Sequence, residues 1–191
     1  MSHIFNRSGG VAVFDLTKNY FELFGLPVSC QVDLKALSGQ YRVLQRAVHP
    51  DRFASDDERQ QLLAVQYASH VNDAFHTLKQ PLNRAIYLLK LAGRDVDMER
   101  NTVMDTAFLM EQMELRESVD EVRSDAHPEK ALELLVARVD GDIDDYLLHF
   151  EQCWQSAGKE DLDQAEAVVK KMQFMVKLAA ELEALESDLL D

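Results

Sequence analysis

The chain has 191 residues, of which 47% are hydrophobic and 28% charged, and its formal net charge is −14. This composition is typical of a globular protein with one domain or two small ones. The charge is uneven, because residues 1–95 hold 11 Lys and Arg against 9 Asp and Glu, whereas residues 96–191 hold 9 against 25. We therefore expect two modules with different partners, and the acidic half argues against binding to nucleic acid or to anionic membranes.

Targeting and redox features are sparse. No apolar run approaches the ~20 residues needed to cross a bilayer, and residues 1–18 resemble neither a secretory signal nor an Arg-rich transit peptide. A cytoplasmic protein is therefore expected. Cys30 and Cys153 lie far apart and form no CxxC pair. The sequence predicts no disulfide framework and no zinc site.

In chain order, residues 1–18 are expected to be a leader that could be disordered. Helical patterns and turn signals follow. They predict one short helix over Tyr20–Leu26, a second over Asp33–Val48, a third over Asp56–Lys79, and a fourth that Pro81 opens and Gly93 closes. In the third helix, five residues at helical spacing are expected to face the second: Leu62, Val65, Ala68, Phe75 and Leu78.

The second helix has two distinct faces. Five apolar residues fall within an arc of about 80° and are expected to face the core: Leu34, Leu37, Tyr41, Leu44 and Val48. Lys35, Arg42 and Arg46 cluster within about 40° on the opposite side. Such a basic stripe taken alone is usually a solvated helix face, so it indicates docking only in combination with the residues at the C-terminal end of the helix.

The helix is followed by His49-Pro50-Asp51. Proline disfavours helical dihedrals at the preceding residue and fixes its own φ, so the chain is expected to leave the helix at a stiffened corner. Ser55 to Glu58 then reads as a capping box that starts the next helix. This helix, corner and helix, with Asn19–Pro27 before it and Val71–Leu78 after it, resembles a J domain, the module by which DnaJ-type co-chaperones stimulate the ATPase of DnaK-type chaperones.

Residues 94–104 are mostly polar and are expected to be a linker. Beyond them the pattern predicts one helix from Asp105 to about Arg123, one from Pro128 to about Gln155, and a last one from about Asp161 to Leu190. Short connections between three long helices favour an antiparallel bundle. Gly141 is expected to interrupt the middle helix.

The helix after Asp105 carries two apolar stripes. The first, expected to face the core, contains Phe108, Leu115, Val119 and Val122. The second contains Leu109, Met110 and Met113, beside Glu114 and Glu117. A second stripe rimmed by carboxylates suggests a partner-binding surface, and methionine suits an adaptable one. The alternative is that this helix also packs against the first domain and buries both stripes.

The segment Asp105–Glu117, DTAFLMEQMELRE, is similar to the opening of the client-binding domain of the HscB family, J-proteins of iron–sulfur cluster assembly. The resemblance runs from about Asn19 to the C-terminus. It implies that an IscU-type scaffold protein docks on six residues: Leu109, Met110, Met113, Glu114, Glu117 and Phe174. It implies that an HscA-type chaperone meets six others: His49, Pro50, Asp51, Lys35, Arg42 and Arg46. The absence of the N-terminal CxxC pair of many eukaryotic members favours a bacterial type.

The expected protein is all-α, with a J domain over 19–93, a linker over 94–104 and a three-helix client-binding domain over 105–191. We expect a monomer with no metal, no cofactor and no catalytic residues. His49 and Asp51 could in principle act as an acid and base pair, but the sequence holds no HExxH, nucleophile elbow or phosphate loop. A J-protein with another client, or a helical interaction protein, remains the alternative.

Overall fold

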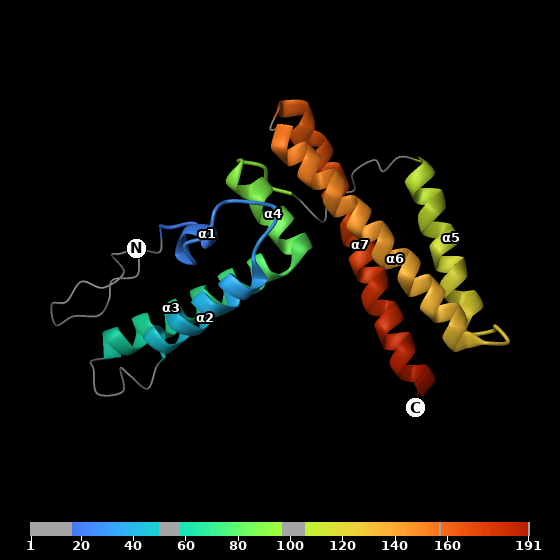
Figure 1. Ribbon diagram of the computed structural model, residues 1–191, viewed down its shortest axis with the longest axis horizontal. Helices are drawn as coiled ribbons and strands as arrows, with labels where there is room; N and C mark the ends of the chain where they lie inside the picture. The colour runs from blue at the N-terminus through green and yellow to red at the C-terminus, as the bar shows by residue number, and fades with distance from the viewer. Residues whose placement is uncertain (1–16, 50–57, 97–105, 157, 191) are drawn as a thin grey trace. The chain divides into compact units, whose positions relative to one another are not determined.

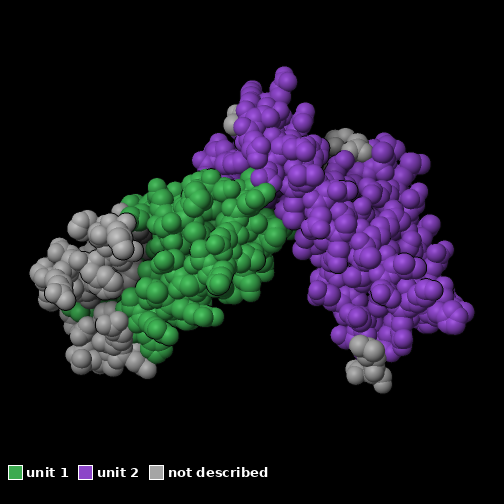
Figure 2. Space-filling model, in the orientation of Figure 1, with its two compact units in different colours: residues 1–84 green, residues 85–191 purple. Residues whose placement is uncertain are grey.

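The computed structural model describes residues 17–49, 58–96, 106–156 and 158–190. These residues form seven α-helices and no strand (Figure 1), so the all-α prediction is confirmed for this part of the chain. None of the helices in these ranges is both long and apolar enough to span a membrane. The chain divides into two compact units, residues 1–84 and 85–191 (Figure 2). The division lies inside the fourth helix, and the sequence-based boundary near residue 93 remains a prediction.

The first unit contains α1 (Tyr20–Leu23), α2 (Leu34–Val48) and α3 (Glu58–Lys79). The Asn19 side chain accepts a hydrogen bond from the Glu22 N–H, and the Glu22 carboxylate accepts one from the Asn19 N–H, both at 3.0 Å. This capping box starts α1. Gly25 follows with a φ of +65°, a conformation that glycine adopts without strain, so α1 ends before the predicted Leu26.

Helices α2 and α3 pack against each other in the first unit. On α2 the core face is nearly as predicted, since Leu37, Leu44 and Val48 are buried, but Leu34 is exposed. On α3 the prediction was wrong for Leu62 and Val65, which are 59% and 53% exposed. The buried residues of α3 are Ala64, Tyr67, Val71, Ala74 and Leu78. They span about 80° of the helix, whereas the predicted set spans about 200°, so only the observed set can face one neighbour.

The second unit holds most of α4 (Pro81–Leu91), together with α5 (Thr106–Val122), α6 (Pro128–Ser156) and α7 (Lys159–Leu190). Helix α7 packs along α6, and α5 packs against α6, which makes the predicted three-helix bundle. One buried apolar cluster holds the three helices together. Its members are Leu115, Val119, Val122, Leu132, Leu135, Val139, Met175, Leu178, Leu182 and Leu185.

Helices α6 and α7 also differ from the prediction. Helix α6 runs unbroken through Gly141, because packing along a helix of 29 residues outweighs the cost of about 1 kcal/mol for one glycine. Helix α7 begins at Lys159 rather than Asp161. Asp161 lies in its first turn and accepts a hydrogen bond from the Gly158 N–H at 3.2 Å, which satisfies a helix-start donor that has no partner within the helix.

Candidate functional site: two docking surfaces

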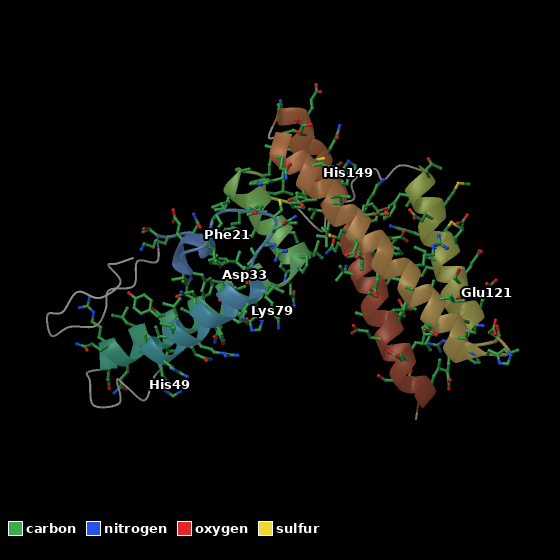
Figure 3. All side chains as sticks on the ribbon, viewed as in Figure 1. Phe21, Asp33, His49, Lys79, Glu121 and His149 are labelled. Carbon is green, nitrogen blue, oxygen red and sulfur yellow. The ribbon has the colours of Figure 1, made fainter. Side chains whose placement is uncertain are left out.

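The first candidate surface is the basic face of α2. Lys35, Arg42 and Arg46 are all exposed on this helix, and they lie opposite its buried side chains. His49 caps the helix with a φ of −59° and a ψ of 127°, so the backbone turns extended there, as the following proline requires. Figure 3 shows the His49 side chain at the opposite end of α2 from Asp33. Pro50 and Asp51, the other two residues of the predicted corner, lie outside the described residues.

Tyr41 holds the basic face of α2 in register with α3. Its ring stacks on that of Phe75, with centroids 4.0 Å apart and planes at 18°. Its hydroxyl donates a hydrogen bond to Asn72 Oδ1 at 2.9 Å and accepts one from Gln45 Nε2 at 3.0 Å. The bond to Asn72 and the stack on Phe75 both join α2 to α3. The helix that carries the basic face is therefore fastened to α3 at Tyr41.

Two sets of hydrogen bonds hold the start of α2 and the segment before it. Asp33 Oδ1 accepts hydrogen bonds from the N–H groups of Lys35 and Ala36 at 2.9 and 3.0 Å, as an N-cap carboxylate does. Further along the chain, the Arg84 guanidinium donates to the carbonyls of Cys30 at 2.7 Å and Leu78 at 2.6 Å. Burial lowers the pKa of Arg84. These bonds tie the segment before α2 to the end of α3.

The second candidate surface is the apolar stripe of α5. Leu109, Met110 and Met113 are 46%, 62% and 65% exposed. Glu114 and Glu117 are exposed beside them, while Phe108 of the same helix is buried. The bundle is therefore complete without the second stripe. The second stripe is thus uncovered within its own unit, and the alternative expectation, burial of both stripes against the first domain, is left untested.

Phe174 of α7 is partly buried and packs at the edge of the bundle core, as its position about 120° from the buried stripe predicts. Its ring meets that of Phe108 edge to face, with centroids 5.9 Å apart and planes at 85°. The Arg116 guanidinium lies over the Phe174 ring at 5.8 Å and pairs with Glu181 at 2.7 Å. Arg116 links α5 to α7 at this point.

These contacts place Phe174 relative to the α5 stripe. Around α5, Arg116 lies about 80° from Phe108, and Leu109 and Met113 follow at about 100° and 140° in the same direction. Since Phe174 contacts both Phe108 and Arg116, it lies on the side of α5 that carries Leu109 and Met113. Residues of α5 and α7 that lie at least 57 positions apart in the chain thus contribute to one surface, which we call the α5–α7 surface: Leu109, Met110, Met113, Glu114, Glu117 and Phe174.

Sequence reasoning missed the residues that support this surface. Besides Arg116, Tyr146 of α6 meets the Phe108 ring edge to face at 6.5 Å, and the Lys171 ammonium lies 5.1 Å from that ring. Helical spacing puts Arg116 and Phe108 on neighbouring sides of α5, so the sequence could have shown that these two residues lie close together. No sequence pattern could have shown the ion pair of Arg116 with Glu181, because the two residues are distant in the chain. Across the described ranges, no three His, Cys, Asp or Glu side chains are grouped to hold a metal ion.

Comparison with known proteins covers nearly the whole chain. The Co-chaperone protein HscB homolog of Shewanella loihica is 46% identical over 177 residues, which span 90% of this chain and 99% of that protein. The homolog of Vibrio cholerae is also 46% identical, over 173 residues with the same coverage. A family model described as the HSCB C-terminal oligomerisation domain matches residues 104–183.

Solved structures agree with these relatives. Chaperone HscB from Vibrio cholerae superposes with a TM-score of 0.80 at 42% identity and covers 90% of this chain and 99% of its own. Human co-chaperone protein HscB gives a TM-score of 0.81 at 28% identity, with coverage of 90% and 84%. The α2–α3 pair with exposed His49 at the end of α2, the three-helix bundle and these relatives together identify a J-type co-chaperone. Within that class, the chain belongs to the HscB family.

Proposed function

We propose that this protein binds an IscU-type scaffold protein on the α5–α7 surface and delivers it to an HscA-type chaperone during iron–sulfur cluster assembly and transfer. The observation that carries the proposal is the exposure of Leu109, Met110 and Met113 on a helix whose other stripe already fills the bundle core. Exposed apolar patches rimmed by polar residues mark sites of protein interaction. Methionine side chains can adapt to the shape of a partner.

The basic face of α2 is the proposed site for the chaperone. Lys35, Arg42 and Arg46 would meet an acidic surface on the ATPase domain, and His49 with Pro50 and Asp51 would favour hydrolysis of the bound ATP. Exposed charges of this kind mainly accelerate encounter and set orientation. The protein itself would make and break no bond and would need no cofactor.

Coupling between the two surfaces follows from covalent connection. A scaffold held on the bundle and a chaperone held on the J domain share one chain, which raises the effective concentration of each near the other. We propose that the protein is a monomer, because delivery needs both surfaces free. We also propose that it acts in the cytoplasm. The matched domain model carries oligomerisation in its description, so the mass of the free protein in solution is the direct check on this point.

Steady-state ATP hydrolysis by an HscA-type chaperone tests the proposal. The chaperone is assayed with this protein and an IscU-type scaffold, added singly and together, alongside the His49→Gln variant. We expect stimulation that exceeds the sum of the two single additions and that is lost in His49→Gln. Scaffold binding should be unchanged in that variant, because His49 is exposed on the J domain.

Other outcomes discriminate between the candidate functions. Stimulation without synergy would keep the J-protein but assign it a different client. No stimulation by the wild-type protein would leave a helical interaction protein whose His-Pro-Asp corner is coincidental. Loss of helicity in His49→Gln would make the histidine structural.

A further inference from the structure

The bundle carries a second surface feature that the proposed function does not use. It is a groove of about 530 Å³ lined by the first half of α6 and the last turns of α7. Figure 1 shows that these two segments lie at the end of the bundle where the chain ends. Val136 and Leu189, both partly buried, are among its apolar lining residues. Leu109 and Phe174 are not among the lining residues, so the groove is separate from the α5–α7 surface.

The groove is acidic as well as apolar. Glu129, Glu133 and Asp140 line it from α6, and Glu186 lines it from α7. None of its described lining residues is basic, and the last turn of α7 also has no basic side chain. An adjoining hollow of about 600 Å³ shares Glu129 and Leu189 and adds His127 and Lys130. Four carboxylates therefore face one lysine and one histidine around a strip of apolar surface.

The shape and charge of the groove select among occupants. Glu129 and Asp140 are about 17 Å apart along α6, which corresponds to about three turns of a helix lying beside it. Such a length favours an elongated occupant over a compact small molecule. The bundle of a second copy is disfavoured by charge, since residues 96–191 hold 25 Asp and Glu against 9 Lys and Arg. A cationic occupant with an apolar stripe would satisfy both the carboxylates and the apolar floor.

We propose that this groove, bounded by Glu129, Glu133, Asp140 and Glu186, docks a basic amphipathic helix of a partner protein. The apolar side chains of that helix would cover Val136 and Leu189, and its lysines or arginines would pair with the carboxylates. The groove would give the protein a binding site independent of the α5–α7 surface. A third protein could then associate while the scaffold is bound.

The test uses the full chain and a synthetic amphipathic peptide of about 18 leucine and lysine residues, long enough as a helix to span the groove. Fluorescence anisotropy of the labelled peptide gives Kd, and backbone amide shifts locate the contact. The groove variant is Glu129→Gln with Glu133→Gln and Glu186→Gln. The matched control removes three exposed carboxylates elsewhere on the bundle: Asp144→Asn, Asp145→Asn and Glu160→Gln. A peptide of lysine and glycine with the same charge controls for bulk attraction.

We expect the Leu/Lys peptide to bind, with shifts at Val136 and Leu189. The groove variant should raise Kd about tenfold and the control at most about twofold, because only the first removes apposed charge pairs. The proposal is overturned by no binding, by equal losses in the two variants, by equal binding of the Lys/Gly peptide, or by shifts at Leu109 instead. Dimerisation of the free protein that only the groove variant abolishes would assign the groove to a second copy and also overturn it.

Discussion

The rings of Phe108 and Phe174 meet edge to face, 5.9 Å between centroids, and join the opening of α5 to the middle of α7. Of this pair, Phe108 is buried and Phe174 is partly exposed. Phe108 therefore serves the packing of the bundle core, whereas part of the Phe174 ring is accessible to a partner. The two rings thus lie where the core of the bundle meets its proposed binding surface.

Truncating the exposed stripe should weaken scaffold binding and spare the fold. For Leu109→Ala with Met113→Ala, we expect a loss of about 1–3 kcal/mol in binding free energy, as for residues at the centre of an interface. The melting temperature should hardly change, since both side chains are exposed. Calorimetric titration with an IscU-type scaffold checks the first point. Leu134→Ala, at a leucine of α6 that is as exposed as Met113, is the control and should leave Kd unchanged.

Phe174 needs a gentler substitution than its neighbours on α5. Phe174→Ala would disturb the contacts with Phe108 and Arg116, so lost binding and lost packing would be confounded. Phe174→Leu keeps apolar volume and should weaken scaffold binding with a stability loss below about 1.5 kcal/mol. By contrast, Phe108→Ala should cost about 3–5 kcal/mol of folding free energy. Urea unfolding measures the stability of both variants. Equal losses of stability in Phe174→Leu and Phe108→Ala would contradict the assignment of Phe108 to the core and Phe174 to the surface.

Reversing charge on the basic face of α2 should slow chaperone association. In Arg42→Glu with Arg46→Glu, we expect a lower association rate constant at low salt and a difference that shrinks as ionic strength rises. Stopped-flow binding to an HscA-type chaperone at several salt concentrations measures the association rate constant of each variant. Arg123→Glu with Arg138→Glu makes the same charge change at exposed sites of the bundle and should have little effect. A salt-independent loss in the first variant would count against electrostatic steering.

The Tyr41 hydroxyl should stabilise the hairpin of α2 and α3. Tyr41→Phe keeps the stack on Phe75 and removes the hydrogen bond to Asn72, so we expect a loss of about 0.5–1.5 kcal/mol. A double-mutant cycle with Asn72→Ala, followed by urea unfolding, isolates the coupling between the two residues. Additive single effects would show that the bond contributes nothing. Chaperone stimulation should survive Tyr41→Phe, because the basic face is untouched.

Cys153 should make folding stability fall at alkaline pH. Burial raises the pKa of its thiol above the ordinary value of 9.0, and the carboxylate of Asp161 adds to the shift. The folded state therefore favours the neutral thiol. The contribution of this thiol to folding stability is complete below pH 9.0 and is lost as pH rises through the pKa of the folded state. Unfolding free energies between about pH 7 and 11 should fall less steeply in Cys153→Ala than in the wild type. Parallel slopes would exclude the thiol as a source.

Helix ends and helix faces that depend only on residues close together in the chain could be predicted from the sequence. Asp33 caps α2 because its carboxylate reaches N–H groups two and three residues on, and Gly93 follows α4 with a φ of +76° that glycine adopts readily. The two stripes of α5 could also be separated, because each is a periodicity within a single helix. These are local properties, so the chain need not be folded for them to be recognised.

Only the tertiary structure decided which of several apolar faces is buried. Leu62 and Val65 were expected to face α2, yet α3 turns Tyr67 and Val71 inward instead. A helix with apolar residues on two sides is stabilised by whichever side finds a neighbour, and periodicity does not name that neighbour. The same reason explains why the position of Phe174 beside Arg116 could not be read from the sequence. Contacts between residues far apart in the chain depend on how whole helices pack, which no local pattern encodes.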